Sequence, residues 1–368
     1  MFLVNIYQGI PLSIWYCIYN GPEPEKYSEA GYGLIRWDST KKPSYFAAQT
    51  ICQKLAGYSY TERLNVGNGD DYVLKLRKGQ DEALAMWTVG GTHNVTVPIA
   101  EAMGTLVTML GNESPISWGS SGLTTSISQS PQYVLYRGPT IAEAKGMANG
   151  ILCTIRDPLV TATPSVSQFY VESDDRCAGM AVYKSSHGLS PGVRVDIIGT
   201  TSTNSGGEKY INATTVAAVG PGGETIEPLV LSLRAVGGAD WCYDASTRAG
   251  QKGVRDYRPV KSGDSWILAF TDAVGLNNIG LLITTFGKVT YSTSGYFYLD
   301  DGSKLKDNST CTGVKVLGTV PPPQPTPPGW TALGKYVIVT GISSCFKAAS
   351  PSTDLYRQIR ATEVVIVN

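Results

Sequence analysis

Residues 192–199, GVRVDIIG, recur with the same spacing as GKYVIVTG at residues 334–341. Other short segments around them recur in the same order: VT at 160–161 and 289–290, FY at 169–170 and 297–298, DD at 174–175 and 300–301, C-x-G-x-x-V at 177–182 and 311–316, and I-x-A-T-x-V at 211–216 and 359–364. Preserved order and approximate spacing predict two copies of one β-domain.

Each copy offers roughly five strands in roughly 90 residues with glycines at the bends, which suits a five-stranded barrel of the OB type. We expect the first copy over residues 139–240 and the second over 241–368, with a linker at 233–257. The second copy contains PPPQPTPPGW at 321–330. Its prolines exclude a strand and favour a stiff surface excursion.

Residues 58–138 show a period of two, in which apolar and polar residues alternate. Six short strands separated by turns are typical of a small antiparallel β-sandwich. The expected strands are YVLKLRK (72–78), EALAMWTV (82–89), HNVTVPI (93–99), LVTML (106–110), GLTTSIS (122–128) and YVLYRG (133–138).

Residues 1–57 predict a single β/α unit. The continuous apolar run GIPLSIWYCIYNG (9–21) is typical of a strand buried on both faces of a parallel sheet. KKPSYFAAQTICQKLAG (41–57) predicts a helix with Pro43 near its start and Gly57 after its end. One such unit cannot cover its own apolar faces. The fold class is therefore mainly β, with one β/α unit, one sandwich and two barrels.

Composition excludes several classes of protein. Thirty Lys and Arg balance 30 Asp and Glu, so nucleic acid and anionic membranes are disfavoured as partners. Forty-one Gly, 21 Pro and only 16% charged residues argue against an all-helical protein. The sequence contains no run of 18 apolar residues, so it predicts no membrane-spanning helix. Residues 1–10, MFLVNIYQGI, lack the features of a secretory signal.

Candidate metal and nucleophile sites are weak, and we expect neither a metal nor another cofactor. The seven cysteines form no CxxC pair and are expected to be mostly buried thiols. His93 and His187 lie too far apart in sequence to suggest a triad or a metal site. The acidic pairs at 174–175 and 300–301 fit hairpin turns better than calcium loops, because no DxDxDG pattern surrounds them.

The repeated aromatic pairs, Phe169-Tyr170 and Phe297-Tyr298, are the candidates for stacking on nucleic-acid bases. Side chains alternate along a strand, so core packing accounts for one residue of each pair and leaves the other at the surface. The composition shows no basic groove beside them.

The N-terminal text carries a family resemblance. The segments that carry it are GIPLSIWYCIYNG, GYGLIRWD and KKPSYFAAQTI, followed by MWTVGG and ISQSPQYVLY. With these segments, residues 1–137 resemble the last β/α unit and the C-terminal sandwich of the clan of retaining (β/α)8-barrel glycosidases, which includes endoglucanases and β-xylosidases. The tandem repeat behind them resembles OB-fold domains appended to secreted bacterial proteins.

The resemblance implies a substrate-binding role for Trp15. In the clan, the eighth barrel strand carries a Trp whose ring forms the base of the sugar site, and Trp15 stands at the corresponding position. The clan's two catalytic glutamates follow the fourth and seventh strands, which have no counterpart in this sequence, and retaining chemistry needs both carboxylates. We therefore expect no catalytic residue. Glu23, Glu25 and Glu29 are interpreted as a solvated loop. The sequence YNGP at 19–22 also departs from the clan's acidic pair and Gly.

Two functions of different classes follow. The first is a non-catalytic, carbohydrate-contacting portion of an exported glycosidase, extracellular, with a polysaccharide as its partner. The alternative is an extracellular structural protein that assembles into a homo-oligomer or filament through the unpaired strand of residues 1–57, because free strand edges and wet apolar side chains favour association. Nucleic-acid binding by the barrels is a distant third.

Overall fold

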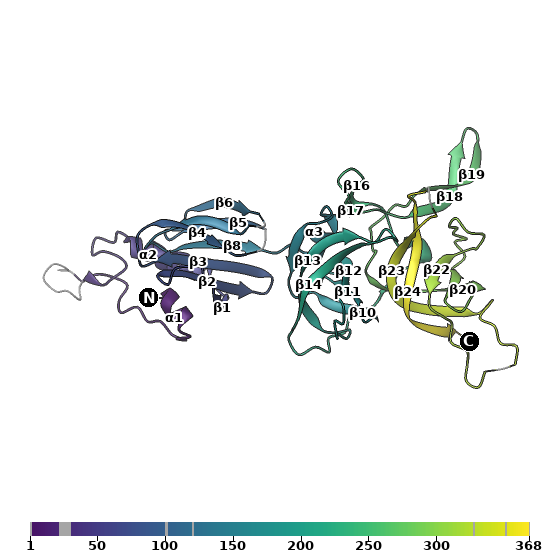
Figure 1. Ribbon diagram of the computed structural model, residues 1–368, viewed down its shortest axis with the longest axis horizontal. Helices are drawn as coiled ribbons and strands as arrows, with labels where there is room; N and C mark the ends of the chain where they lie inside the picture. Colours follow the sequence, from purple (N-terminus) through teal and green to yellow (C-terminus); the bar gives the residue numbers. More distant parts are fainter. Residues whose placement is uncertain are drawn as a thin grey trace. The chain divides into compact units, whose positions relative to one another are not determined.

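The computed structural model describes residues 2–21, 31–99, 102–119, 121–326, 328–349 and 352–367. The chain divides into two compact units, Met1–Gly138 and Pro139–Asn368, and each is described by itself. Both are built mainly of β-strands (Figure 1). Among the helices that the described ranges contain, none has the length and apolar character needed to cross a bilayer.

The first unit is a small sandwich, as the period-two pattern predicts. Its six-stranded antiparallel sheet has the order β1-β2-β3-β8-β5-β6, and a two-stranded sheet of β4 and β7 faces it. The strands are β1 (Ser59–Arg63), β2 (Asp71–Lys78), β3 (Asp81–Thr88), β4 (His93–Val97), β5 (Ala102–Thr108), β6 (Glu113–Trp118), β7 (Leu123–Ile127) and β8 (Gln132–Arg137). Strands β1 and β6 were not among the six expected.

Two apolar cores lie on opposite faces of the six-stranded sheet. One, which includes Val95 and Leu123, packs between the two sheets. The other lies under the helices α1 (Phe2–Tyr7) and α2 (Pro43–Lys54), where Leu3 and Leu55 contact the sheet. The helix expected around Pro43 is thus present, with the proline in its first turn as its fixed φ favours.

The strand expected over 9–21 is wrong. Residues 10–17 have no strand pairing, and an isolated bridge joins Tyr19 to Ile35. Leu12, Ile14 and Tyr16 are exposed rather than buried on both faces. A continuous apolar run becomes a buried strand only where neighbouring strands pair with it, and the described part of the chain provides none for these residues.

The first barrel closes in the order β10-β11-β12-β14-β13, with β10 pairing back to β13. β12 and β14 are parallel, and β9 continues the edge beside β13. Its elements are α3 (Ile141–Gly146), β9 (Leu152–Ile155), β10 (Leu159–Ser165), β11 (Gln168–Glu172), β12 (Gly179–Tyr183), β13 (Arg194–Thr203) and β14 (Lys209–Val219).

The second barrel repeats this topology, which confirms the two OB-like five-stranded barrels that the repeat predicts. Strand β20 pairs with both β21 and β23, and β22 and β24 are parallel. The elements are β15 (Leu229–Val230), η2 (Leu233–Ala235), β20 (Leu282–Ser292), β21 (Tyr296–Asp300), β22 (Val314–Leu317), β23 (Tyr336–Lys347) and β24 (Leu355–Val367).

Equivalent glycines bend the fourth strand of each barrel. The register slips by one residue at Gly199 in β13 and at Gly341 in β23. A Cβ at Gly341 would lie 2.2 Å from the carbonyl oxygen of Arg360, and one at Gly199 would lie 2.5 Å from that of Asn212. The bulge therefore needs glycine at the same place in both copies, which explains their matched spacing in the sequence.

Two hairpins lie between the barrels in sequence, and part of the linker expected at 233–257 forms them. One consists of β16 (Trp241–Asp244) and β17 (Ala249–Gln251), and the other of β18 (Arg255–Ser262) and β19 (Ser265–Asp272), which projects in Figure 1. The described residues of the proline-rich insertion form no strand, as expected, and Trp330 at its end packs against the core of the second barrel.

The two barrels make polar contacts with each other. Glu172 at the end of β11 accepts the backbone N–H of Leu282 at the start of β20. The buried Lys145 amine donates to the carbonyl of Ile279 at 2.6 Å. Gly179 lies so close to the second barrel that a Cβ there would be 2.3 Å from the carbonyl oxygen of Gly280. These contacts hold the backbones of the two barrels together.

Burial corrects two expectations. Phe169, Tyr170, Phe297 and Tyr298 are all buried, whereas one of each pair was expected at the surface. The outward-facing member is covered because Tyr170 lies at the contact with the second barrel and Tyr298 donates to Asp307. The cysteines are not mostly buried either. Two of the seven are buried, three are exposed and two are intermediate, and all are free thiols.

Candidate functional site

Trp15 lies in the irregular segment after α1, not on a strand. Its indole N–H donates to the carbonyl oxygen of Tyr32 at 3.0 Å, and its ring stacks on Phe2 with 5.9 Å between centroids. One ring face and the polar edge are therefore already occupied. Its sugar-binding role stays a prediction, and Glu23, Glu25 and Glu29 lie outside the described residues.

The other residues singled out in the sequence have local structural partners. Asp175 and Asp301 each accept hydrogen bonds within a turn, from Ser173 and Ser303 respectively. His93 contacts the Asp71 carboxylate at 2.9 Å. Within the described ranges no group of three or more His, Cys, Asp and Glu is placed to hold a metal ion.

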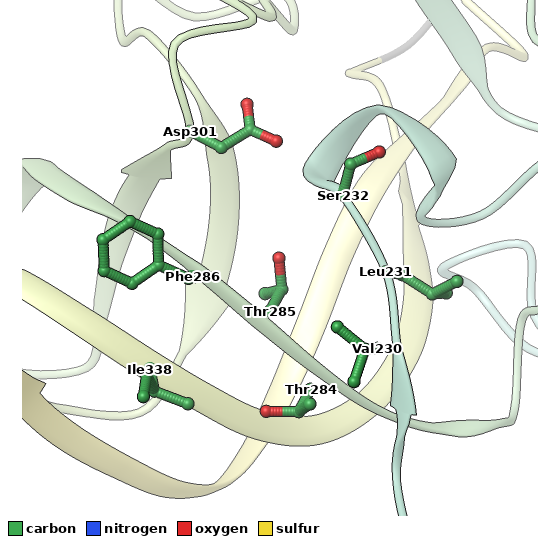
Figure 2. A pocket seen from close by; sticks show the side chains of 8 residues that line it. All are labelled: Val230, Leu231, Ser232, Thr284, Thr285, Phe286, Asp301 and Ile338. Atoms are coloured by element: carbon green, nitrogen blue, oxygen red, sulfur yellow. The ribbon is translucent and has the colours of Figure 1, made fainter.

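The second barrel carries a pocket of about 380 Å³ beside its first strand, shown in Figure 2. The short strand β15 pairs in parallel with the first part of β20, and β21 pairs with the last part, so the edge of β20 around Thr285 faces an opening. Eight residues line it: Val230, Leu231, Ser232, Thr284, Thr285, Phe286, Asp301 and Ile338.

One side of the pocket is apolar and aromatic. Phe286 is 48% exposed, and its ring stacks almost parallel on Tyr336, with 5.7 Å between centroids and 11° between planes. Ile338 lies directly opposite Phe286 in the β20–β23 pairing and is also exposed. These side chains stand on the outer face because residues on a strand alternate between its two faces. An exposed ring of this kind can pack against the C–H face of a sugar.

The other side of the pocket is polar. In Figure 2 the oxygens of Asp301, Ser232 and Thr285 lie in the upper half of the view, with Phe286 at the left. Thr285 is only 4% exposed, and its hydroxyl has no hydrogen-bond partner among the described residues. Leaving such a group unsatisfied costs about 1–3 kcal/mol. The oxygen has almost no accessible surface, so it lies beneath the pocket wall rather than at a point that a ligand can contact.

Asp301 supplies the charge of the site. Burial by itself would raise the pKa of its carboxyl group, but hydrogen bonds from Ser303 and from the backbone N–H of Leu233 outweigh it and hold the pKa below its ordinary value. The group is therefore a carboxylate at neutral pH. Each oxygen of a carboxylate can accept two hydrogen bonds. Oδ1 already accepts two from Ser303, whereas Oδ2 accepts one, from Leu233, and so retains capacity to accept from a ligand hydroxyl.

This lining suits binding rather than glycoside hydrolysis. Asp301 is the one titratable side chain among the eight lining residues, and hydrolysis with retention needs two carboxylates on either side of the bond. An aromatic ring and a carboxylate acceptor together match a neutral sugar, which offers apolar C–H faces and several hydroxyl groups.

Only one part of this pocket was marked by a sequence pattern. Asp301 belongs to the repeated acidic pair, although it was interpreted only as a turn residue. Phe286 and Thr285 lie in an ordinary alternating strand, and nothing in the text marks them. Their significance depends on residues 230 and 338, which are far from them in sequence and reach the site only through strand pairing.

No protein-family model matches this chain, and no curated protein matches it. One solved structure that it resembles is described as a family 39 glycoside hydrolase from the gut symbiont Bacteroides cellulosilyticus WH2, at 25% sequence identity and a TM-score of 0.29. The match covers 33% of this chain and only 25% of that chain. A glycoside hydrolase is thus among its structural neighbours.

Proposed function

We propose that this chain is a non-catalytic, carbohydrate-binding part of a glycosidase-related protein, and that the Phe286–Asp301 pocket of its second barrel holds a sugar unit. The observation that carries the proposal is the exposed Phe286 ring in the same pocket as the Asp301 carboxylate. A volume of about 380 Å³ is in the range of small-molecule sites. Cell-wall polysaccharides lie outside the cell membrane, and with one of them as its partner the protein would be extracellular.

Binding to polysaccharides tests the site. We would measure retention of the purified chain in gels containing cellulose derivatives, xylan or mannan, followed by titration calorimetry with the matching oligosaccharide. Phe286→Ala removes the ring, and Asp301→Asn removes the charge of the acceptor at nearly constant volume. Each should weaken binding at least tenfold, since loss of a stacking or hydrogen-bonding partner is worth about 1.4 kcal/mol or more.

Tyr291→Ala is the matched control, because Tyr291 is a similarly exposed aromatic on the same strand but does not line the pocket. It should leave the affinity unchanged. Absence of binding to every polysaccharide, or equal binding by the two pocket variants, would reject the site. If Trp15→Ala alone abolished binding, the sugar would lie in the first unit instead. Hydrolysis of a chromogenic β-glycoside by the chain would overturn the non-catalytic role.

A second candidate function, assembly with further copies of this chain, is favoured by the exposed segment 10–18. Leu12, Ile14, Tyr16 and Ile18 are all more than half exposed and alternate with less exposed residues. Burying each of them against a partner would contribute about 1.5–3 kcal/mol.

Light scattering on a size-exclusion column tests assembly. The native chain should run as a dimer or larger species at micromolar concentration. Replacing Leu12, Ile14 and Ile18 together by Ser should convert it to a monomer, while the same change at the exposed Val166 of the first barrel should not. A monomeric native chain at every concentration would reject this function.

A further inference from the structure

A second pocket, of about 500 Å³, is formed where three loops of the barrel pair meet. The β13–β14 loop of the first barrel, the β16–β17 hairpin and the ends of β23 and β24 supply its lining. These residues are Asn149, Thr203, Asn204, Ser205, Gly207, Tyr243, Ala245, Arg248, Gly250, Lys252, Lys347, Thr353 and Leu355.

The lining is cationic, although the chain as a whole has no net charge. It contains Arg248, Lys252 and Lys347 and no acidic residue. The Lys252 amine donates to the carbonyl oxygen of Thr353 at 2.9 Å. Arg248 and Lys347 are exposed and form no ion pair with any described residue. Two cationic groups are thus free to meet an anion.

Three carboxylates are adjacent to the lining in sequence, and none of them is paired with Arg248 or Lys347. Glu208 is buried and accepts a hydrogen bond from the Tyr170 hydroxyl. Asp244 accepts hydrogen bonds from Ser246 and Thr247 within its own turn. Asp354 lies 3.7 Å from the Arg255 guanidinium. Arg248 and Lys347 therefore remain available to a ligand anion.

A fourth basic side chain lies behind the lining. Lys209 is buried, and its amine donates to the Asn149 side chain at 2.9 Å and to the carbonyl oxygens of Met147 and Arg248. These bonds fix the Asn149 oxygen, which leaves its amide N–H groups as the donors available to a ligand. Asn204 is held likewise, because its side-chain oxygen accepts the backbone N–H of Glu208 at 3.0 Å.

We propose that this pocket binds an acidic saccharide, with a uronate carboxylate held by Arg248 and Lys347. A guanidinium matches a carboxylate with two parallel hydrogen bonds, and a lysine adds a point charge. The asparagine amides and the hydroxyls of Thr203 and Ser205 suit sugar hydroxyl groups, and the half-exposed Tyr243 ring can contact a sugar face.

This site differs in place and in chemistry from the neutral-sugar pocket, so the two proposals fail independently. Titration calorimetry would compare digalacturonate with the neutral disaccharide of the same linkage, at low salt, on the full chain. Digalacturonate should bind, the neutral sugar should bind at least tenfold more weakly, and added salt should weaken the acidic ligand.

The variants separate charge from fold. Arg248→Asn suits the left-handed backbone at this residue, where φ is 56°. Combined with Lys347→Gln, it should lower the affinity for digalacturonate at least tenfold. Lys335→Gln, at the opposite end of the same strand region, should have no effect, and Phe286→Ala should leave this binding intact while it affects the neutral sugar.

Four results would overturn the proposal. The first is absence of digalacturonate binding, and the second is equal affinity for the neutral disaccharide. The third is binding of inorganic phosphate as tightly as the saccharide, which would show a simple anion site. The fourth is tighter, salt-sensitive binding of an oligothymidylate, which would assign the pocket to single-stranded nucleic acid.

Discussion

Glu208 is the side chain whose removal should most clearly report the packing of the two barrels. It belongs to the first barrel and is 1% exposed. Both its oxygens lie 3.1 Å from the Tyr170 hydroxyl, which donates to them, and the second barrel supplies the Ser344 hydroxyl at 3.4 Å and the Arg360 guanidinium at 3.8 Å. Burial raises the pKa of Glu208, and the charge of Arg360 opposes that rise.

The change Glu208→Ala leaves Arg360 without its carboxylate and the buried Tyr170 hydroxyl without its acceptor. Breaking a buried pair by removing one partner costs about 3–5 kcal/mol. In a unit of this size, one kcal/mol lowers the unfolding temperature by about 2–4 °C, so the expected fall is roughly 6–20 °C. Glu208→Gln keeps an acceptor for Tyr170 and should cost less, about 1–3 kcal/mol.

Differential scanning calorimetry of the full chain would measure this change. The transition of Pro139–Asn368 should move, and that of Met1–Gly138 should stay where it is. Glu224→Ala is the control, since Glu224 is an exposed acid of the same barrel paired with Arg194, and its effect should be much smaller. If Glu208→Ala cost no more than Glu224→Ala, the barrels would not be packed in solution as described, and the reasoning would fail.

Three further perturbations have defined outcomes. The Gly91 carbonyl and the Asp71 carboxylate raise the pKa of His93 above 6.5. The stabilisation that protonated His93 gives should therefore be complete below pH 6.5 and be lost as pH rises through the folded-state pKa. The urea midpoint of the first unit should be higher at pH 5.5 than at pH 8.5 on this account, and His93→Gln should remove that difference. Gly179→Ala should destabilise the barrel pair by about 1–3 kcal/mol by overpacking, measured by urea unfolding, and an unchanged midpoint would contradict the close backbone approach. Burial raises the pKa of Cys345 well above its ordinary value, so mass spectrometry after alkylation at pH 8 should find it unmodified until the protein unfolds, while the three exposed cysteines react first.

The barrels and the sandwich were predictable because local patterns decide them. Strand alternation and the repeated GVRVDIIG and GKYVIVTG segments carry the barrel topology, down to the bulge at Gly199 and Gly341. The helix after Pro43 was equally local. Each of these features depends on neighbours in sequence, which periodicity records directly.

The failures have a common physical cause. The run 9–21 is apolar enough for a buried strand, but whether it pairs depends on other strands. The same holds for Tyr170 and Tyr298, whose outer positions are covered by partners that an isolated strand pattern does not reveal. The pocket beside Thr285 joins residues more than a hundred positions apart, so only the folded chain shows that its hydroxyl lacks a partner.

The polar contact at Tyr170 has no counterpart among the described residues of the second barrel. The equivalent Tyr298 donates at 2.7 Å to Asp307 within its own barrel, and the position equivalent to Glu208 holds Tyr356. The Tyr356 ring packs against Phe270 of the β18–β19 hairpin, with 5.6 Å between centroids.

The first barrel thus contacts the second through Glu208, whereas the second barrel has Tyr356 and the β18–β19 hairpin at the equivalent surface. Tandem domains in extended arrays repeat the same contact from one copy to the next, and terminal copies carry altered, capping surfaces. The second barrel lacks the acid through which the first barrel contacts it, and its equivalent surface is packed by the β18–β19 hairpin.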